Sequence, residues 1–339
     1  MYVRRNFNLK GLLNFTGFHF IWLTAYSVLA VYLYDGLGFT FLAIPWLPMS
    51  LIGVAVAFYV GFKNDASYER MWEARKIWGA IVNDSRSFGV ASKNLVESSA
   101  TSDSKGDIKD LVHRHIAWLY TLRFQLLKPA AWEHSQAGFL IGMVARRRHK
   151  TFGLGLYDIE AHDETLSKLL NKTEFKEMHT YSNMATHLLG KQTKLLKDLN
   201  NDDRLNNFRH MNMQALLYNF YDHQGKCERI KNYPFPRQYA SMSFIFVGLF
   251  ILLLPFSLIP EFAQVGIHSV WLSVPFTVLA AWVFLMMELV GDYSENPFEG
   301  LGNDIPMLAI CRTIEIDLRE ILGEEDIPEP IKPLNNVLM

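Results

Sequence analysis

Long apolar runs alternate with polar segments along this chain and set its organisation. Four runs lie at roughly 15–34, 39–62, 239–259 and 270–290, and their only formal charge is Glu288 near the end of the last run. An α-helix of about 20 apolar residues is long enough to cross the hydrocarbon core of a bilayer. The pattern therefore predicts four transmembrane helices, arranged as one hairpin at each end of the chain.

The distribution of basic residues predicts how these hairpins are oriented. The loops inside the hairpins, 35–38 and 260–269, contain no Lys or Arg. Basic residues flank the opposite ends of the runs, at Arg4, Arg5, Lys10, Lys63, Arg70, Arg75, Lys76 and Arg237. Since positively charged flanks stay on the cytoplasmic side of a membrane, we expect both termini and the middle segment to be cytoplasmic.

The middle segment, 64–236, is polar and has apolar residues at helical spacing, as at Ile108, Leu111, Val112 and Leu119. Alternating strand-like runs are absent from the sequence of this segment. The sequence therefore predicts an all-α protein with four parts. The parts are 1–63 with the first two membrane helices, 64–236 as a cytosolic helical domain, 237–290 with the last two membrane helices, and 291–339 as a cytosolic loop, helix and tail.

The second run continues into a long helix that carries two stripes. Pro45 and Pro48 stand early, where proline harms a helix least, and nothing breaks the pattern up to about Trp78. One stripe is small (Gly53, Ala57, Gly61) and the neighbouring one is bulky and apolar (Val54, Phe58, Phe62). In a ring of identical helices, the small stripe would pack against a neighbour and the bulky stripe would point inward, as a constriction that gates ions by dewetting. Ordinary packing between membrane helices is the alternative explanation.

Several motifs of this sequence resemble those of the bestrophin family, in particular its bacterial branch. The segment GVAVAFYVGFKN at 53–64, followed by SYERMWEARKIWG at 67–79, resembles the family's signature. Further similar motifs are PFP at 234–236, NPF at 296–298, NDIP at 303–306 and CRTIE at 311–315. They occur in the family's order around the four runs, so the resemblance covers nearly the whole chain.

The resemblance implies a fold, an assembly and an activity. Bestrophin-like proteins are helical homopentamers with one central pore. Animal members are calcium-activated channels for chloride and bicarbonate, and bacterial relatives conduct ions, some of them cations. We therefore expect a homopentameric ion channel, with membrane lipid and small inorganic ions as its partners, in the inner membrane of a bacterium.

The family's pore residues can be carried over to this sequence. The three apolar residues of the pore neck fall on Val54, Phe58 and Phe62, which agrees with the bulky stripe. A second, cytosolic constriction falls near Phe208, by counting back from the motif CER at 227–229. The resemblance thus predicts two narrow points along one pore.

The calcium site of the animal members has a weak counterpart here. The acidic run that follows NPF in those proteins is reduced to Glu299, Asn303 and Asp304, interrupted by glycines, with Asn296 of the motif itself as a further oxygen donor. We therefore expect no cofactor and no calcium regulation, and expect this loop to cap the preceding helix.

The sign of the conducted ion is not fixed by sequence pattern. Basic Arg209 and His210 adjoin one predicted constriction, whereas acidic Glu288 lies at the end of the fourth run and Asp292 and Glu295 follow it. Phenylalanine ring edges favour anions slightly. With the family resemblance, this leads us to expect passive conduction of anions such as chloride, with a monovalent-cation channel of the same fold as the alternative.

Three other classes of protein are compatible with the membrane helices. A secondary transporter would need ionisable groups inside the bilayer, and His19 is the one such group well within a run. An enzyme is not favoured, because the sequence has no metalloprotease or phosphate-loop motif, and Cys227 and Cys311 match no metal spacing. A non-conducting scaffold could use the basic run at 146–150. The net charge of −1 argues against a nucleic acid as partner.

Overall fold

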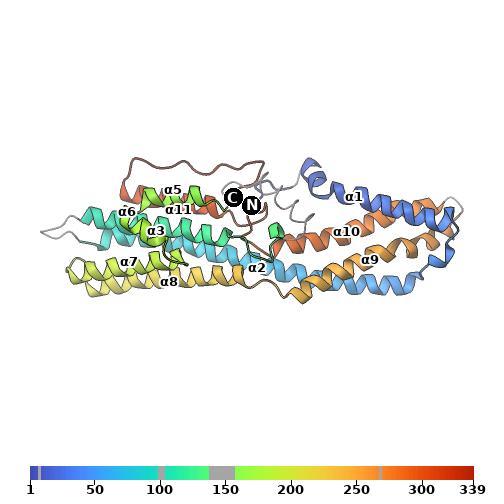
Figure 1. The fold of residues 1–339 in the computed structure, drawn as a ribbon, viewed down its shortest axis with the longest axis horizontal. Helices are drawn as coiled ribbons and strands as arrows, with labels where there is room; N and C mark the ends of the chain where they lie inside the picture. Colours follow the sequence, from blue (N-terminus) through green and yellow to red (C-terminus); the bar gives the residue numbers. More distant parts are fainter. Residues whose placement is uncertain (7–8, 98–103, 137–156, 267–268) are drawn as a thin grey trace. The chain divides into compact units, whose positions relative to one another are not determined.

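The computed structural model describes residues 1–6, 9–97, 104–136, 157–266 and 269–339. Within these ranges the chain forms helices and no strand, apart from isolated backbone bridges that join Tyr2 and Leu334 to Val337 (Figure 1). The predicted all-α class is confirmed. The basic run at 146–150 lies outside the described residues.

Helices account for most of the described chain. The longer ones are α1 (Leu9–Val31), α2 (Trp46–Leu95), α3 (Ser104–Leu127), α7 (Met184–Asn201), α8 (Asn207–Asn232), α9 (Arg237–Ala263), α10 (Ser273–Ser294) and α11 (Met307–Leu322). Shorter helices are α5 (Ile159–Leu169) and α6 (Lys172–Met178), and single helical turns lie at Tyr32–Gly36, Thr40–Leu42, His134–Gln136 and Ser269–Leu272. Among the described residues, four helical stretches, in α1, α2, α9 and α10, are long and apolar enough to cross a membrane, which confirms the predicted number.

The chain divides into two compact units. We call the first, formed by Arg4–Arg70 and Pro234–Glu295, the membrane unit. We call the second, formed by Met1–Val3, Met71–Tyr233 and Asn296–Met339, the polar unit. The polar unit thus groups the first three residues with the middle segment and the tail.

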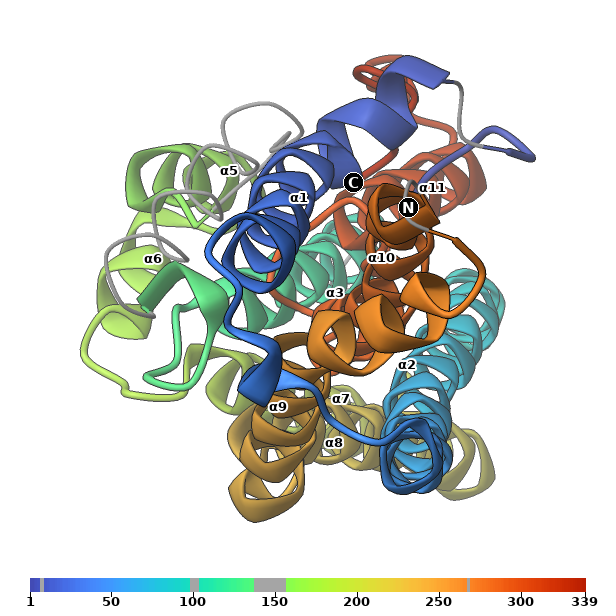
Figure 2. The ribbon, with the colours of Figure 1, turned by 90° about the vertical axis from the view of Figure 1, so that its right-hand side faces the viewer.

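Helix α10 lies beside both α1 and α9 in the membrane unit (Figures 1 and 2). The buried core of this unit is aliphatic and aromatic, with contributions from α2 as well; it contains Leu23, Met49, Val56, Val60, Val247, Phe250, Ile251, Leu254, Val278 and Ala281. Apolar side chains are buried here because they pack against one another, which also keeps the neighbouring helices in contact.

Helix α9 contains two prolines, and the structure shows how one of them is accommodated. Pro260 has no N–H to donate to the carbonyl of Phe256, four residues earlier. The backbone N–H of Ile44 donates to that carbonyl instead, at 3.0 Å. A membrane helix tolerates proline when a neighbouring segment satisfies the freed carbonyl in this way, and the contact also holds the segment before α2 against α9.

Helix α3 is the centre of the polar unit. It contacts α5, α7, α8 and α11, and its residues 111–122 are all buried. Several of its polar side chains are paired across the core: Arg114 with Glu174, His115 with Ser85, Trp118 with Gln224, and Tyr120 with Glu315. A helix of mixed polarity is buried on all sides because its polar groups have these partners.

Candidate pore-lining helix and surrounding sites

Helix α2 is the element that the sequence predicts to line a pore. Its 50 residues make it roughly 75 Å long, and it continues well beyond Trp78, where the predicted helix ended. Pro48 lies in its first turn, as expected. In the membrane unit one face of α2 is buried, with positions three or four apart at Gly53, Val56, Val60 and Lys63. This face packs inside the chain, so a pore can be lined only by the remaining faces.

The three predicted neck residues all lie on an exposed face of α2. Val54, Phe58 and Phe62 are 70%, 69% and 61% exposed. The Phe58 and Phe62 rings contact each other edge to face, with centroids 4.5 Å apart. We call these three side chains the apolar ridge. An exposed ridge of large apolar side chains on a membrane helix is available to lipid, to another copy of the chain or to a pore.

The small stripe beside this ridge does not act as one surface within the chain. A Cβ atom at Gly53 would lie 2.9 Å from the Phe250 ring of α9, so this glycine permits close packing between α2 and α9. Ala57 is half-buried, whereas a Cβ at Gly61 would meet nothing within 4 Å. The packing of Ala57 and Gly61 against a neighbouring helix stays a prediction, and the use of Gly53 inside the chain was not predicted.

Two acidic side chains continue the exposed face of α2 beyond the ridge. Asp65 and Glu69 are exposed and lie seven residues after Phe58 and Phe62, respectively. Seven residues correspond to nearly two full turns, so each carboxylate lies on the same side of the helix as a ridge phenylalanine. These carboxylates were not predicted, although the seven-residue spacing is visible in the sequence.

The acidic residues in and just after α10, in contrast, are engaged in ion pairs within the membrane unit. Glu288 is buried and paired with Lys63, and Glu295 is buried and paired with Arg237. Asp292 is half-buried, 3.8 Å from the Lys63 ammonium. Glu288 and Glu295 therefore each neutralise a cation within the membrane unit, and this pairing was not predicted.

Phe208, the predicted second constriction, lies at the start of α8 in the polar unit. Its side chain is 87% exposed. The Asn206 side chain caps this helix by accepting from the N–H of Arg209, at 3.0 Å, and Arg209 forms an ion pair with Glu97. The first turn of α8 is thus fixed from both sides while Phe208 stays uncovered. Its role in a constriction stays a prediction.

The predicted calcium loop is held together by its own hydrogen bonds. Asp304 is fully buried, and its Oδ2 accepts from the backbone N–H groups of Gly300 and Leu301, at 2.7 and 2.9 Å. Burial raises the pKa of Asp304 to about 7. The Glu299 carboxylate lies 2.8 Å from the His134 ring nitrogen.

The side-chain amide of Asn296, the first residue of the loop, also forms a hydrogen bond within the protein. Asn296 donates to Glu133, which is itself buried and paired with Lys231. Asn303 is exposed. Three of these four side chains, Asn296, Glu299 and Asp304, are thus engaged in contacts inside the protein. Among the described residues no group of three or more His, Cys, Asp and Glu side chains could hold a metal ion.

His19, His113 and His115 each have a partner within the protein. The Trp22 indole donates to Nδ1 of His19 at 3.1 Å within α1. His113 lies 2.8 Å from the Glu324 carboxylate, whereas His115 is fully buried against Ser85, and burial lowers the pKa of His115 to about 3. His113 and His115 have different partners and do not form a joint site. Cys227 and Cys311 are free and buried.

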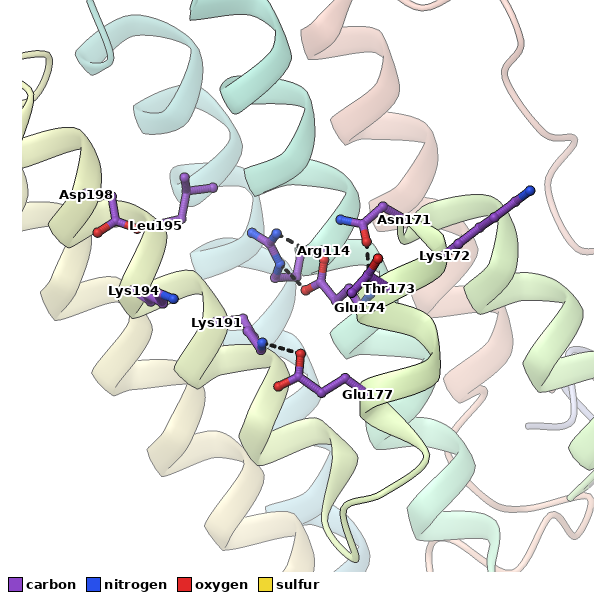
Figure 3. Close-up of a pocket in the computed structure, with 10 residues that line it drawn as sticks. All are labelled: Arg114, Asn171, Lys172, Thr173, Glu174, Glu177, Lys191, Lys194, Leu195 and Asp198. Carbon is purple, nitrogen blue, oxygen red and sulfur yellow. Dashed lines mark hydrogen bonds and ion pairs between the residues drawn. The ribbon is translucent and has the colours of Figure 1, made fainter.

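A hollow of about 540 Å³ lies on the polar unit between α3, α6 and α7 (Figure 3). The Arg114 guanidinium at its back forms two hydrogen bonds with Glu174, and the Lys191 ammonium is 2.5 Å from Glu177. These four charges compensate one another. The arrangement resembles the buried and surface ion pairs that stabilise a helical bundle, and it brings no nucleophile together with a base.

Comparison with known proteins finds relatives of this chain. Residues 17–320 match the family described as bacterial and fungal bestrophin proteins. The voltage-dependent anion channel-forming protein YneE of Salmonella typhimurium is 30% identical over 282 residues, which cover 83% of this chain and 78% of the relative. The protein of the same name from Escherichia coli K12 is 27% identical over 287 residues, covering 84% and 80%.

Solved structures show the same fold. A bacterial bestrophin homologue from Klebsiella pneumoniae superposes with a TM-score of 0.73, at 23% sequence identity, and the match covers 91% of this chain and 98% of that one. The family match spans the first membrane run, the apolar ridge, the NPF motif and most of α11. This chain is therefore a member of the bacterial and fungal bestrophin family.

Proposed function

We propose that this protein is a bestrophin-type ion channel that conducts small anions such as chloride passively across a membrane. The observation that carries the proposal is the apolar ridge of α2, whose three large side chains face away from the chain's own core. The relatives at 27–30% identity are named voltage-dependent anion channel-forming proteins. The proposed activity is therefore non-enzymatic.

The ridge supports a particular assembly. In a homopentamer, five copies of α2 would surround one pore with Val54, Phe58 and Phe62 facing the axis. A narrow passage lined by such side chains excludes water and ions when closed, and small changes in its radius admit them. Phe208 would line a second narrow passage in the polar unit. Membrane lipid would cover the other apolar faces.

The surroundings of the channel are part of the same proposal. The basic flanks of the membrane helices support cytoplasmic termini and, for a bacterial chain, the inner membrane. Regulation without calcium is supported by the loop at 296–304, because Asp304 accepts backbone hydrogen bonds and Glu299 faces His134.

A monovalent-cation channel is the second candidate, and one observation favours it. Asp65 and Glu69 lie on the same side of α2 as the ridge phenylalanines. If that face lines the pore, five copies would place ten carboxylates beside the neck, which would concentrate cations.

Current across a planar bilayer separates these candidates. The full-length protein would be purified, inserted into a bilayer and exposed to a gradient of potassium chloride. We expect discrete single-channel currents whose reversal potential lies toward the chloride equilibrium potential. A reversal potential near that of potassium would select the cation channel. The absence of current from protein shown to be inserted would overturn both.

A further inference from the structure

A buried ion pair connects α2 to α10 inside the membrane unit. The Lys63 ammonium of α2 donates to the Glu288 carboxylate of α10, and the two side chains are only 2% and 3% exposed. The other oxygen of Glu288 accepts from the hydroxyl of Ser243 on α9. Lys63, Ser243 and Glu288, which we call the buried triad, thus tie three helices together through charge-assisted hydrogen bonds.

The triad lies directly beside the apolar ridge. Lys63 follows Phe62 in sequence, but its side chain occupies the buried face of α2 whereas Phe62 occupies the exposed one. The earlier positions of that buried face, Val56 and Val60, are apolar and pack in an apolar cluster. Apolar surfaces can pack in more than one rotational setting, whereas a buried charge must meet its partner, so the triad specifies one setting of α2.

A close contact next to the triad restricts α2 further. Gly291 of α10, three residues after Glu288, faces Asn64 of α2, and a Cβ atom at position 291 would overlap with the Asn64 Oδ1. A side chain at position 291 would require the Asn64 side chain to move, whereas the Asn64 Cα, at 3.6 Å, would lie at ordinary contact distance. The turn of α2 that contains Phe62, Lys63 and Asn64 is therefore held by a charge pair and by steric contact.

We propose that Lys63 and Glu288 are positioning residues that set the direction in which Phe58 and Phe62 point, and hence how far the neck is open. The inference rests on the proposed function, because it assigns the neck to this face of α2. When Lys63 is removed, the buried Glu288 carboxylate keeps only the Ser243 hydroxyl; when Glu288 is removed, the Lys63 ammonium keeps only the half-buried Asp292, 3.8 Å away. The turn then shifts to bring the remaining charge toward water, and the ridge turns with it.

A purely stabilising ion pair would behave differently. Its loss would lower the melting temperature and the yield of assembled protein, but it would leave the ridge of the assembled molecules in place. The orientation of the ridge is therefore the informative quantity. A cysteine introduced at position 62 reports it, because the two native cysteines are buried and leave little background reaction with a water-soluble thiol reagent.

The test combines the variant Phe62→Cys with changes in the triad, in full-length protein reconstituted in vesicles. The changes are Lys63→Met, Glu288→Gln, and the exchange Lys63→Glu with Glu288→Lys. Glu261→Gln, which neutralises an exposed carboxylate near the end of α9, is the matched control. The rate at which a cationic methanethiosulfonate modifies the introduced thiol is measured in each, and the open probability is measured in bilayers for the same changes with Phe62 intact.

We expect each single change to alter the modification rate and the open probability by about tenfold, and the charge exchange to return both to within about threefold of the parent protein. The control leaves both unchanged. If a single change prevents assembly, Ser243→Ala and Gly291→Ala carry the test, because both retain the two charges, and each is expected to alter the rate by about threefold.

Modification rates within about twofold of the parent in all assembled variants would overturn the inference. A parent protein that does not conduct would refute the proposed function. The modification rate can be measured without current, so it would still test whether the triad sets the orientation of the ridge.

Discussion

Two phenylalanines of α8, Phe208 and Phe220, differ in how far their side chains are exposed. Phe208 is uncovered at the start of the helix, whereas Phe220 is fully buried between Phe88, His115 and Trp118. The sequence alone could not separate them, because both are phenylalanines in one helix with a polar pattern. The buried position of Phe220 was not predicted, whereas Phe208 was predicted from the family resemblance to line a constriction, and that role stays a prediction.

We predict that Phe208→Ala and Phe220→Ala have opposite profiles. Loss of the Phe220 ring leaves a cavity and should lower the free energy of unfolding by about 3–5 kcal/mol, whereas loss of the exposed Phe208 ring should change it by less than about 0.5 kcal/mol. Under the proposed function, Phe208→Ala instead increases single-channel current. Thermal unfolding and bilayer recording of both variants check this, and a strongly destabilised Phe208→Ala protein would argue against its exposure.

His115 gives the polar unit a predictable response to acid. Burial lowers the pKa of His115 to about 3, below its unfolded value of 6.5, so the unfolded state binds more protons between these pH values. Stability contributed by the neutral ring is thus present above pH 6.5 and is lost as the pH falls. Between pH 7 and pH 5 this amounts to about 2 kcal/mol.

The variant His115→Gln should show a smaller loss of melting temperature between pH 7 and pH 5 than the parent protein, although its stability at pH 7 is lower. Glutamine does not titrate, so it removes the proton linkage while keeping a polar partner for Ser85. Equal losses in the two proteins would show that His115 is not the group responsible.

At the scale of elements, α2 shows which features of a helix can be predicted from the spacing of its residues. The four-residue spacing groups Val54, Phe58 and Phe62, and all three are exposed; their role as a pore neck stays a prediction. The spacing did not reveal that Lys63 is buried, because a lysine at the end of an apolar run is typical of a cytoplasmic flank. Its partner Glu288 is 225 residues away, and such pairing depends on how α2 and α10 pack.

The exposed carboxylates of α2 lead to a prediction about selectivity. Neutralising both, as Asp65→Asn with Glu69→Gln, should move the reversal potential toward that of chloride, because the cation-attracting charge beside the neck is removed. Bilayer recording in a salt gradient measures the shift, with Glu261→Gln as control. An unchanged reversal potential would mean that these residues do not face the conduction path.

At the scale of the whole molecule, the sequence predicted the helical class and four membrane helices. It did not predict that the first three residues belong to the polar unit, where the backbone of Val3 donates to Asn336. That contact joins the two ends of the chain, which no local pattern can indicate. Similarly, the loop at 296–304 looked like a reduced calcium site, and its internal hydrogen bonds became visible only in the fold.

The assembly proposed for the chain predicts a definite mass. Five chains of 39.1 kDa give about 196 kDa of protein, and native mass spectrometry of the detergent-solubilised complex should detect this species. Lowering the protein concentration should not change it, because membrane-protein pores with buried interfaces are stable assemblies. A monomer or dimer as the largest species would contradict the pentamer.

The central claim, that the apolar ridge of α2 lines an ion-conducting pore, is tested most directly by chemical modification during recording. Single-channel current through the Phe58→Cys variant would be measured before and after a charged, water-soluble thiol reagent is added, with Phe18→Cys, an exposed position of α1, as control. A pore lined by the ridge predicts an abrupt, irreversible change in the current of the Phe58→Cys channel and no change in the control. A Phe58→Cys current that is unaffected, although mass spectrometry shows the cysteine to be modified, would contradict it.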